Sequence, residues 1–307
     1  MSAGEFSLIE TFFSRIGESS AIELGIGDDA ATVLVPDGHA LQISTDTAIE
    51  GVHFPPDFAP ADIAYRSVMA AASDLAAMGA SPIGMLLAIT LPAADAAWLS
   101  CFADGLRAAS DATRLPLIGG DTTRGGLSLT LTVLGATPSS RCLRRDGARA
   151  GDRLCVSGTL GDAAAGLAVI QGKLQPTEKA SAQFLQARFA RPTARLALGE
   201  SLRGVATAAI DVSDGLLADT AHIAHASAVA IEIDSGKVPL SWALKGMPDT
   251  VQARQWALTG GDDYELLVTL RPEAPVPETL TEIGRVVAGR GVRCDQAPTG
   301  GGYDHFA

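Results

Sequence analysis

The sequence has few cysteines, few aromatic residues and no long apolar run. Four of its 307 residues are cysteines, and Phe, Trp and Tyr together make up 5%. The cysteines lie far apart without a CxxC pair, so we expect reduced, idle thiols of a cytoplasmic protein rather than a disulfide framework. Apolar stretches end at Gly, Pro or Asp before the ~18 residues that span a bilayer. The first ten residues, MSAGEFSLIE, lack the pattern of a signal peptide.

Several motifs of known chemistry are also missing. The chain contains no GxxxxGK[ST] P-loop, no GxGxxG after a first strand and no HxxxH pair. It has no GxSxG and no readable Ser–His–acid grouping, so nucleophilic catalysis finds no support. His222 and His225 share a predicted helix, but no third zinc ligand is at hand. A nucleotide enzyme without these motifs would rely on metal ions and arginines.

Basic residues are outnumbered, and lysine is rare among them. The chain has 35 acidic and 23 basic residues, a formal net charge of −12, and 4 of the basic residues are lysines. This balance argues against nucleic acid or a membrane as partner, because both are anionic. An anionic ligand would need local compensation, for which a divalent metal is the obvious candidate.

The hydrophobic pattern predicts a mixed α/β protein. Apolar residues make up 47% of the chain, enough for a sizeable core. We expect an opening helix over 5–16, helices over 60–78 and 95–113, and strands near 31–35, 41–44, 85–90, 117–118 and 127–133. The second half alternates strands and helices in the same way, with strands at 154–156, 208–212, 229–233, 266–270 and 283–287 and helices at 162–171, 180–189 and 216–226. Apolar content drops over Thr137–Arg149. The expected domains are therefore residues 1–138 and 139–307.

Aspartates recur after short apolar strands. They occur in GIGDD (Asp28, Asp29), ISTD (Asp46), LIGGD (Asp121), IDVSD (Asp211, Asp214) and LTGGDD (Asp262, Asp263). Each Gly-Asp pair alone is ordinary turn chemistry. Strand ends in α/β folds open onto one crevice, however, so these side chains are expected to converge there. Converging carboxylates repel by ~4 kcal/mol per pair at 4 Å and an effective dielectric near 20, and Mg²⁺ would compensate them.

Further candidates lie outside these strands. Asp74 sits in an apolar helix, where it is either exposed or bound to a cation. The glycine-rich pieces at 119–126 and 258–263 allow backbone N–H groups to approach phosphate, although paired glycines usually make a tight turn. Arg141, Arg144 and Arg145 form either a phosphate clamp or a solvated basic loop, and His53 is a plausible substrate contact near Asp46.

In order along the chain, these pieces resemble the thiamine-monophosphate kinases, of the superfamily that includes aminoimidazole-ribonucleotide synthetase and selenophosphate synthetase. The resemblance rests on GEFSLI, GIGDDAA, ISTDTAIEGVHF, SDLAAMGASP, LIGGDTTRG, IDVSDGL, GGDDYEL and GGYDHF, and covers nearly the whole chain. It implies two α/β domains, a homodimer built by N-terminal sheets, and direct transfer of the ATP γ-phosphoryl group to thiamine monophosphate with several Mg²⁺ ions.

The resemblance also implies roles for single residues. Metal ligands would be Asp29 (or Asp28 beside it), Ser44, Thr45, Asp46, Asp74, Asp121, Asp211 and Asp214. ATP would contact Gly120, Asp121, Arg145 and Ser213. The acceptor would contact His53, Asp262 and Tyr303, the last by stacking on its ring. The family usually has Glu where this chain has Asp262, so Asp263 or a water is an alternative contact.

Two other interpretations remain open. The chain could be another ATP-dependent synthetase of the superfamily, although it has neither a reactive N-terminal Cys nor a glycine-rich N-terminal arm. It could also be a non-enzymatic acidic protein that binds metal or nucleotide, although it contains no EF-hand loop. Metal-assisted phosphoryl transfer is the reaction class that fits the aspartates best.

Overall fold

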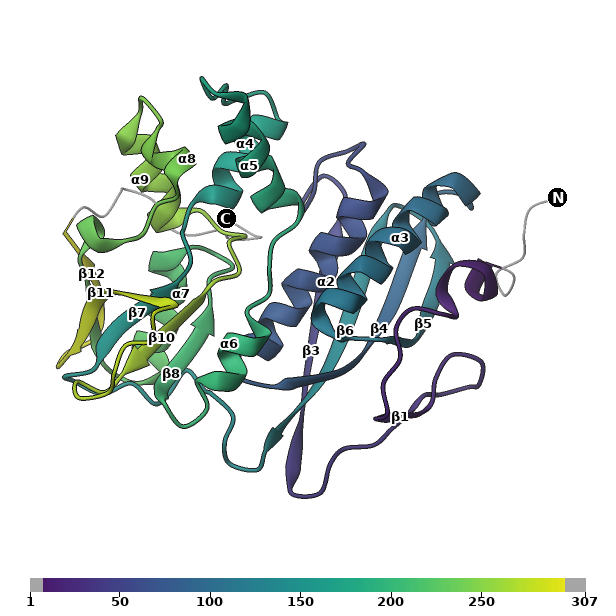
Figure 1. The fold of residues 1–307 in the computed structure, drawn as a ribbon, viewed down its shortest axis with the longest axis horizontal. Helices are drawn as coiled ribbons and strands as arrows, with labels where there is room; N and C mark the ends of the chain where they lie inside the picture. The colour runs from purple at the N-terminus through teal and green to yellow at the C-terminus, as the bar shows by residue number, and fades with distance from the viewer. Residues whose placement is uncertain (1–7, 296–307) are drawn as a thin grey trace. The chain divides into compact units, whose positions relative to one another are not determined.

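The computed structural model describes residues 8–295. The chain divides into two compact units, and each is described by itself (Figure 1). Unit 1 consists of Met1–Leu75 and Ala80–Ser140, and unit 2 of Ala76–Gly79 and Arg141–Ala307. Among the described residues, no helix combines the length and apolar character that crossing a membrane requires. Both units mix helices with strands, as the sequence predicts.

Unit 1 is built on a four-stranded mixed sheet in the order β3-β6-β4-β5. Its strands are β3 (His39–Ile49), β4 (Ser81–Leu91), β5 (Leu117–Arg124) and β6 (Ser128–Pro138). Strand β6 is antiparallel to β3 and β4, and β4 is parallel to β5. Helices α2 (Pro60–Ala77) and α3 (Ala96–Thr113) make the connections from β3 to β4 and from β4 to β5. The short elements η1 (Ile9–Phe13), β1 (Ile22–Leu24) and β2 (Thr32–Val33) precede the sheet.

Both long helices of unit 1 lie against the same face of this sheet (Figure 1). Helix α2 begins at Pro60, whose fixed φ suits a first helical position. The Asp95 side chain caps α3 by accepting the N–H groups of Ala97 and Trp98. A Cβ on Gly105 of α3 would lie 2.0 Å from the Ala61 carbonyl oxygen, so the two helices can approach this closely only with glycine there.

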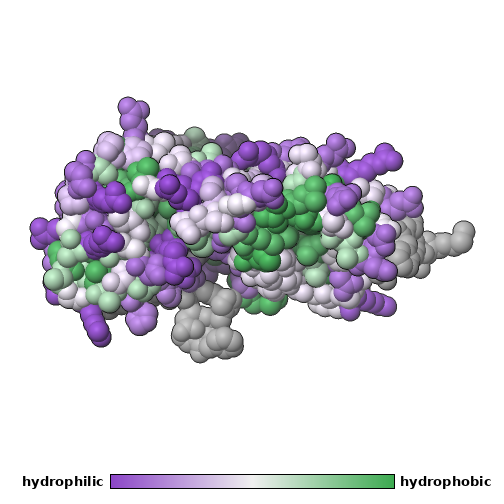
Figure 2. Space-filling view, turned by 90° about the horizontal axis from the view of Figure 1, so that it is seen from below, coloured by the Kyte–Doolittle hydropathy of each residue, from purple (hydrophilic) through white to green (hydrophobic). Residues whose placement is uncertain are grey.

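The other face of the sheet carries hydroxyl pairs and exposed apolar side chains. Thr45 and Thr132 lie 2.9 Å apart through their hydroxyl oxygens, as do Thr47 and Thr130. Ile43, which lies on the same face of β3 as Thr45 and Thr47, is 61% exposed. Figure 2 shows apolar surface gathered in the part of the view that unit 1 occupies. We call this side of the sheet the open face.

Unit 2 contains a six-stranded sheet in the order β12-β9-β11-β7-β10-β8. Its strands are β7 (Arg153–Ser157), β8 (Ala206–Asp211), β9 (Ala230–Ile233), β10 (Leu266–Leu270), β11 (Leu280–Val287) and β12 (Gly291–Cys294). Only the β12–β9 pair of this sheet is parallel among the described residues. The sheet packs its apolar side chains against α7 (Leu216–Ala226) and α9 (Thr250–Thr259).

Helices α4 (Asp162–Ile170), α5 (Lys179–Ala190) and α8 (Trp242–Lys245) of unit 2 form a second, smaller core. Unit 2 also contains α6 (Leu196–Ser201) and η2 (Ser235–Lys237). Ala165, Leu185 and Leu244 bring α4, α5 and α8 together in this cluster, which α9 joins through Ala253.

Two predicted strands are longer in the structure, and this changes where their aspartates lie. Asp46 was expected after a strand over 41–44, but it lies in the middle of β3. Asp121 was expected after a strand over 117–118, but it lies inside β5. Asp211 is the last residue of β8, as expected. Asp46 and Asp121 are thus presented by the faces of the sheet rather than by its strand ends.

Candidate active site

A hydroxyl and two carboxylates meet at the β3 edge of unit 1. Ser44 and Asp46 are two residues apart on β3 and therefore point to the same side of the sheet, toward α2. The Ser44 hydroxyl donates a short hydrogen bond to Oδ2 of Asp74, which lies on α2. The structure therefore brings together three of the metal ligands that the sequence predicts. We call Ser44, Asp46 and Asp74 the acidic group of unit 1.

The two carboxylates of this group repel each other. The pKa of Asp46 is raised to about 6 by burial and, second, by the negative charge of Asp74. A carboxylate pair of this kind is most stable when a cation or a proton is shared between them. Carboxylate and hydroxyl oxygens are ligands that Mg²⁺ prefers, so the donor set fits that ion.

Thr45 and Asp121 lie on the open face instead. The Thr45 hydroxyl meets Thr132, as described above, and Asp121 is exposed on β5 in register with the exposed Ala88 of β4. Strands β6 and β4 separate β3 from β5, so Asp46 and Asp121 belong to strands about 14 Å apart at the usual spacing of ~4.8 Å. Within one chain, the structure does not bring Asp121 to the acidic group of unit 1.

Gly120 has a structural reason to be glycine. Its φ is +152°, and a Cβ there would lie 1.8 Å from the Leu87 carbonyl oxygen of β4. The GGD segment is therefore part of a tightly paired strand rather than a free loop.

Two other candidates of unit 1 lie in connecting segments. His53 follows β3, and its Nδ1 accepts the backbone N–H of Ile49 at 3.1 Å. This bond fixes the imidazole ring with Nδ1 turned to the backbone. Asp28 and Asp29 are exposed, and the Asp28 carboxylate accepts the Asp29 N–H at 2.8 Å. The Asp28 side chain is thus partly used within its own turn.

Unit 2 has an acidic group of its own. Asp211 and Asp214, both predicted as metal ligands, are joined by Asp219 of α7, which is 1% exposed. One ligand atom each from Asp214, Asp219 and His222 lie within 4.8 Å of one another. Burial and the charges of Asp211 and Asp214 raise the pKa of Asp219 to about 8. We call Asp211, Asp214 and Asp219 the acidic group of unit 2.

Asp219 also holds the segment that carries Asp214. Its Oδ2 accepts the backbone N–H groups of Ser213, Asp214 and Gly215 at 3.0–3.1 Å. Sequence reasoning missed Asp219, although its position in the first turn of a helix after VSDG is typical of a carboxylate that binds exposed N–H groups. The same reasoning found His222 without a third ligand, although Asp219 lies three residues before it on the same helix and Asp214 precedes that helix.

The segments 212–215 and 260–265 are bound to each other through their backbones. Asp262 N–H donates to the Ser213 carbonyl and Tyr264 N–H to the Val212 carbonyl, both at 2.9 Å. A Cβ on Gly261 would lie 2.2 Å from the Ser213 oxygen, so the contact needs glycine. The sequence motifs IDVSDG and GGDDYE therefore form a single platform, in which Ser213, Asp214 and Asp262 have fixed relative positions.

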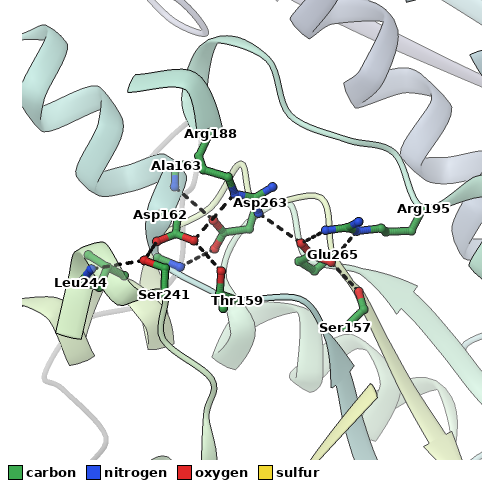
Figure 3. Close-up of polar contacts among 11 residues, drawn as sticks. Ser157, Thr159, Asp162, Ala163, Arg188, Arg195, Ser241, Leu244, Asp263 and Glu265 are labelled. Atoms are coloured by element: carbon green, nitrogen blue, oxygen red, sulfur yellow. Dashed lines mark hydrogen bonds and ion pairs between the residues drawn. The ribbon is translucent and has the colours of Figure 1, made fainter. Parts of the chain in front are cut away.

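A buried network of charged side chains supports this platform (Figure 3). Glu265 is fully buried, and its carboxylate accepts hydrogen bonds from Arg188, Arg195 and Ser157. Asp263 accepts the N–H groups of Gly161 and Ala163 at the start of α4. Because Asp263 is 1% exposed and spends both oxygens inside the protein, it does not replace Asp262 as a substrate contact.

The first residue of α4 continues the network. Asp162 accepts the hydroxyls of Thr159 and Ser241, and Arg188 lies 3.7 Å from it. Burial raises the pKa of both Asp162 and Asp263, the latter to about 8. None of these side chains except Asp263 was singled out from the sequence. The sequence gives little indication of this network, because arginines and acidic residues are usually exposed. Its members also lie far apart in the sequence.

Two further residues were expected to contact ligands, Arg145 the nucleotide and Tyr303 the acceptor. Arg145 is exposed, and its carbonyl accepts the Ser227 hydroxyl. Its neighbour Arg144 forms an ion pair with Asp146 at 2.7 Å. Arg144 therefore does not join Arg141 and Arg145 in the phosphate clamp that was one of the two alternatives. Tyr303 lies outside the described residues.

Both halves of the chain are similar to known proteins. Residues 27–137 match the N-terminal domain of AIR synthase related proteins, and residues 149–295 match the C-terminal domain. A thiamine-monophosphate kinase from Escherichia coli strain K12 is 45% identical over 324 residues, covering 100% of this chain and 99% of the relative.

Two solved structures are similar throughout. A thiamine-monophosphate kinase from Stenotrophomonas maltophilia K279a is 44% identical, covers 96% of this chain and 98% of its own, and gives a TM-score of 0.86. The structure of AaThiL, from Aquifex aeolicus, complexed with AMPPCP and TMP is 36% identical, covers 99% and 97%, and gives a TM-score of 0.82. With this identity over its full length, the chain belongs to the thiamine-monophosphate kinase family.

Proposed function

We propose that this chain transfers the γ-phosphoryl group of ATP directly to thiamine monophosphate, giving thiamine diphosphate and ADP. Family membership and the acidic group of unit 1, whose Asp46 and Asp74 repel each other, carry the proposal. A relative of 36% identity has been solved with an ATP analogue and TMP bound. ATP as co-substrate and four free cysteines support a cytoplasmic enzyme.

The chemistry of the acceptor explains the lack of a protein nucleophile. A phosphate monoester has a second pKa of about 6, so its oxygen is already anionic at neutral pH and needs no strong general base. The task of the site is to bring two anions together inside an acidic protein. Bound Mg²⁺ supplies charge compensation and alignment of the transferred group.

The proposed ligands divide between the two units. In unit 1, Ser44, Asp46 and Asp74 hold metal on the helix side of β3, and Asp29 adds a carboxylate from its exposed turn. In unit 2, Asp211 and Asp214 hold metal, while Ser213 beside them contacts ATP. Arg145 contacts the nucleotide phosphates, and the acceptor is bound by His53, Asp262 and Tyr303. Thr45 and Asp121 complete the metal contacts from the open face, and Gly120 beside Asp121 on β5 contacts ATP.

The position of Asp121 supports a homodimer formed through the open face. Thr45 and Asp121 lie on that face near opposite edges of the sheet, too far apart to share an ion within one chain. Packing against a second copy would bring Thr45 of one chain near Asp121 of the partner and would cover apolar side chains such as Leu41, Ile43 and Ile49. Such an isologous contact is the commonest arrangement among homodimers.

The activity is tested with the purified chain, ATP, Mg²⁺ and thiamine monophosphate. Thiamine diphosphate and ADP should appear in equal amounts. ADP without thiamine diphosphate, or activity only with another acceptor in a panel of amide, carbamoyl and selenide compounds, would assign the chain to a different reaction.

The dimer is tested by mixing two inactive variants, Asp46→Asn and Asp121→Asn. If each site takes Asp46 from one chain and Asp121 from the other, a mixed dimer has one intact site. Equal amounts after subunit exchange should then give about a quarter of the wild-type rate. No recovery in demonstrably mixed dimers would show that Asp46 and Asp121 do not share a site across the dimer.

A further inference from the structure

Tyr264 lies next to the proposed acceptor contact, and nothing described so far gives it a role. It is 8% exposed, and its hydroxyl donates a hydrogen bond to Oδ1 of Asp262 at 3.0 Å. The two residues flank Asp263 on the segment 260–265, whose other side chains point into the buried network of Figure 3. At position 262 this chain has Asp, whose side chain is shorter than that of the Glu usual in the family.

The backbone at these two residues is held in an unfavourable conformation. Asp262 has a φ of +69° and Tyr264 a φ of +52°, in the left-handed region that costs a non-glycine residue roughly 1–3 kcal/mol. Such conformations persist only when the surroundings enforce them, and they cluster at binding sites.

The surroundings here act from both sides of the segment. The Asp262 and Tyr264 N–H groups are bound to the 212–215 segment, and the Val212 N–H returns a bond to the Glu265 carbonyl at 2.8 Å. On the other side, Asp263 is anchored at α4 and Glu265 at the arginine pair. The consequence is that Asp262 and Tyr264 are presented side by side, away from the buried network.

The Tyr264 hydroxyl holds Oδ1 of the Asp262 carboxylate in a fixed orientation. A carboxylate that is oriented in this way is suited to a cation with N–H donors, such as an aminopyrimidine linked to a positively charged thiazolium ring.

We propose that Tyr264 is a positioning residue that fixes the Asp262 carboxylate for recognition of the cationic heteroaromatic part of the acceptor. The proposal rests on the proposed function, because it takes Asp262 as an acceptor contact. It explains how the short side chain serves at this position: the hydroxyl removes the rotational freedom that would weaken binding. The binding of ATP and the transfer step do not involve Tyr264.

Steady-state kinetics of Tyr264→Phe test this proposal. We expect the KM for thiamine monophosphate to rise about tenfold, the scale of a hydrogen bond to a charged group. The KM for ATP, kcat at saturating acceptor and the melting temperature should stay close to wild type. Tyr65→Phe on α2 makes the same chemical change in unit 1 and should leave the acceptor KM unchanged.

A double-mutant cycle separates positioning from a general structural effect. If Tyr264 acts through Asp262, Asp262→Asn and the double variant Asp262→Asn/Tyr264→Phe should have the same acceptor KM, because nothing is left to position. Additive effects, or an unchanged KM in Tyr264→Phe, would overturn the proposal.

If Tyr264→Phe does not fold, the binding of thiamine monophosphate to Asp262→Asn tests the proposal instead. Titration calorimetry of Asp262→Asn with thiamine monophosphate, without ATP, should show weaker binding than wild type, and unchanged binding would overturn the proposal. These outcomes are distinct from a failure of the proposed function, which would appear as a wild-type protein that makes no thiamine diphosphate.

Discussion

The acidic groups of the two units use their carboxylates in different ways. In unit 1, Asp74 is bound by a side-chain hydroxyl, and Asp46 faces it across a helix–strand contact. In unit 2, Asp219 is bound by three consecutive backbone N–H groups. The first arrangement can exchange a hydroxyl for a metal ion without moving the backbone, while the second cannot give up its carboxylate without releasing a loop. Variants in the two units should therefore separate activity from stability.

The largest expected effect is a loss of stability from the network of unit 2. Glu265→Gln removes the buried counter-charge of Arg195 and one of the two buried carboxylates paired with Arg188, and we expect it to lower the free energy of unfolding by about 3 kcal/mol. Urea denaturation measures this. Glu282→Gln removes the partner of Arg153 at a side chain that is 41% exposed and should cost less than about 1 kcal/mol. Similar losses for both variants would contradict a special role of the network.

The second effect is a loss of activity from unit 1. Asp46→Asn should lower kcat at least ~10²-fold, the scale of one preorganised charge-stabilising group. Its stability without metal should not fall, because the change removes the repulsion with Asp74. Asp104→Asn, which breaks an exposed pair with Arg107 in the same unit, is the control and should leave kcat unchanged. Near-normal turnover of Asp46→Asn would remove this residue from the metal site.

The third effect is a pH dependence of metal binding in unit 1. Because the pKa of Asp46 is raised to about 6, this carboxyl is protonated below that pH and must lose its proton to bind a cation. Mn²⁺ or Mg²⁺ affinity, measured without nucleotide, should weaken below pH 6 by up to about tenfold per pH unit. Asp46→Asn should lack this dependence. A wild-type affinity that is flat from pH 7 to pH 5 would show that Asp46 does not bind the ion.

The smallest effect is a pH dependence of stability in unit 2. The folded state holds a proton on Asp219 up to about pH 8, whereas the unfolded chain loses it near pH 4. Without metal, this group's contribution to stability is therefore greatest below pH 4 and is lost as the pH rises to about 8. Asp219→Asn keeps an acceptor oxygen for the three N–H groups and removes the titration. Its unfolding free energy should fall less between pH 5 and pH 8 than that of wild type, and an identical slope would contradict the assignment.

The sequence predicts the long helices and the family, but it misplaces the aspartates of unit 1. Strand β3 runs on through the STD motif because Thr45 and Thr47 alternate outward and pair with threonines of β6. Polar side chains on that face hide the strand from a search for apolar runs. In β5, the paired glycines look like a phosphate loop, but Gly120 is needed because the β4 backbone comes too close for a side chain.

The polar partners in unit 2 could not be predicted for another reason. Glu265 and Arg195 form their contacts through pairing of β8 with β10 and through helices that lie far from them in sequence. Helix α9 was missed as well, since its apolar residues Ala253, Ala257 and Leu258 make only a short stripe. Local periodicity contains no record of such long-range partners.

The starts of α4 and α7 carry a further consequence for how unit 2 meets phosphate. Each of these helix ends already has an internal carboxyl group on its N–H groups, Asp263 at α4 and Asp219 at α7. A triphosphate arriving there would have to displace a side chain that the fold itself supplies. Neither end can therefore serve as a ready-made cradle, and the polyanion must find its positive charge in cations carried in with it and in arginine side chains.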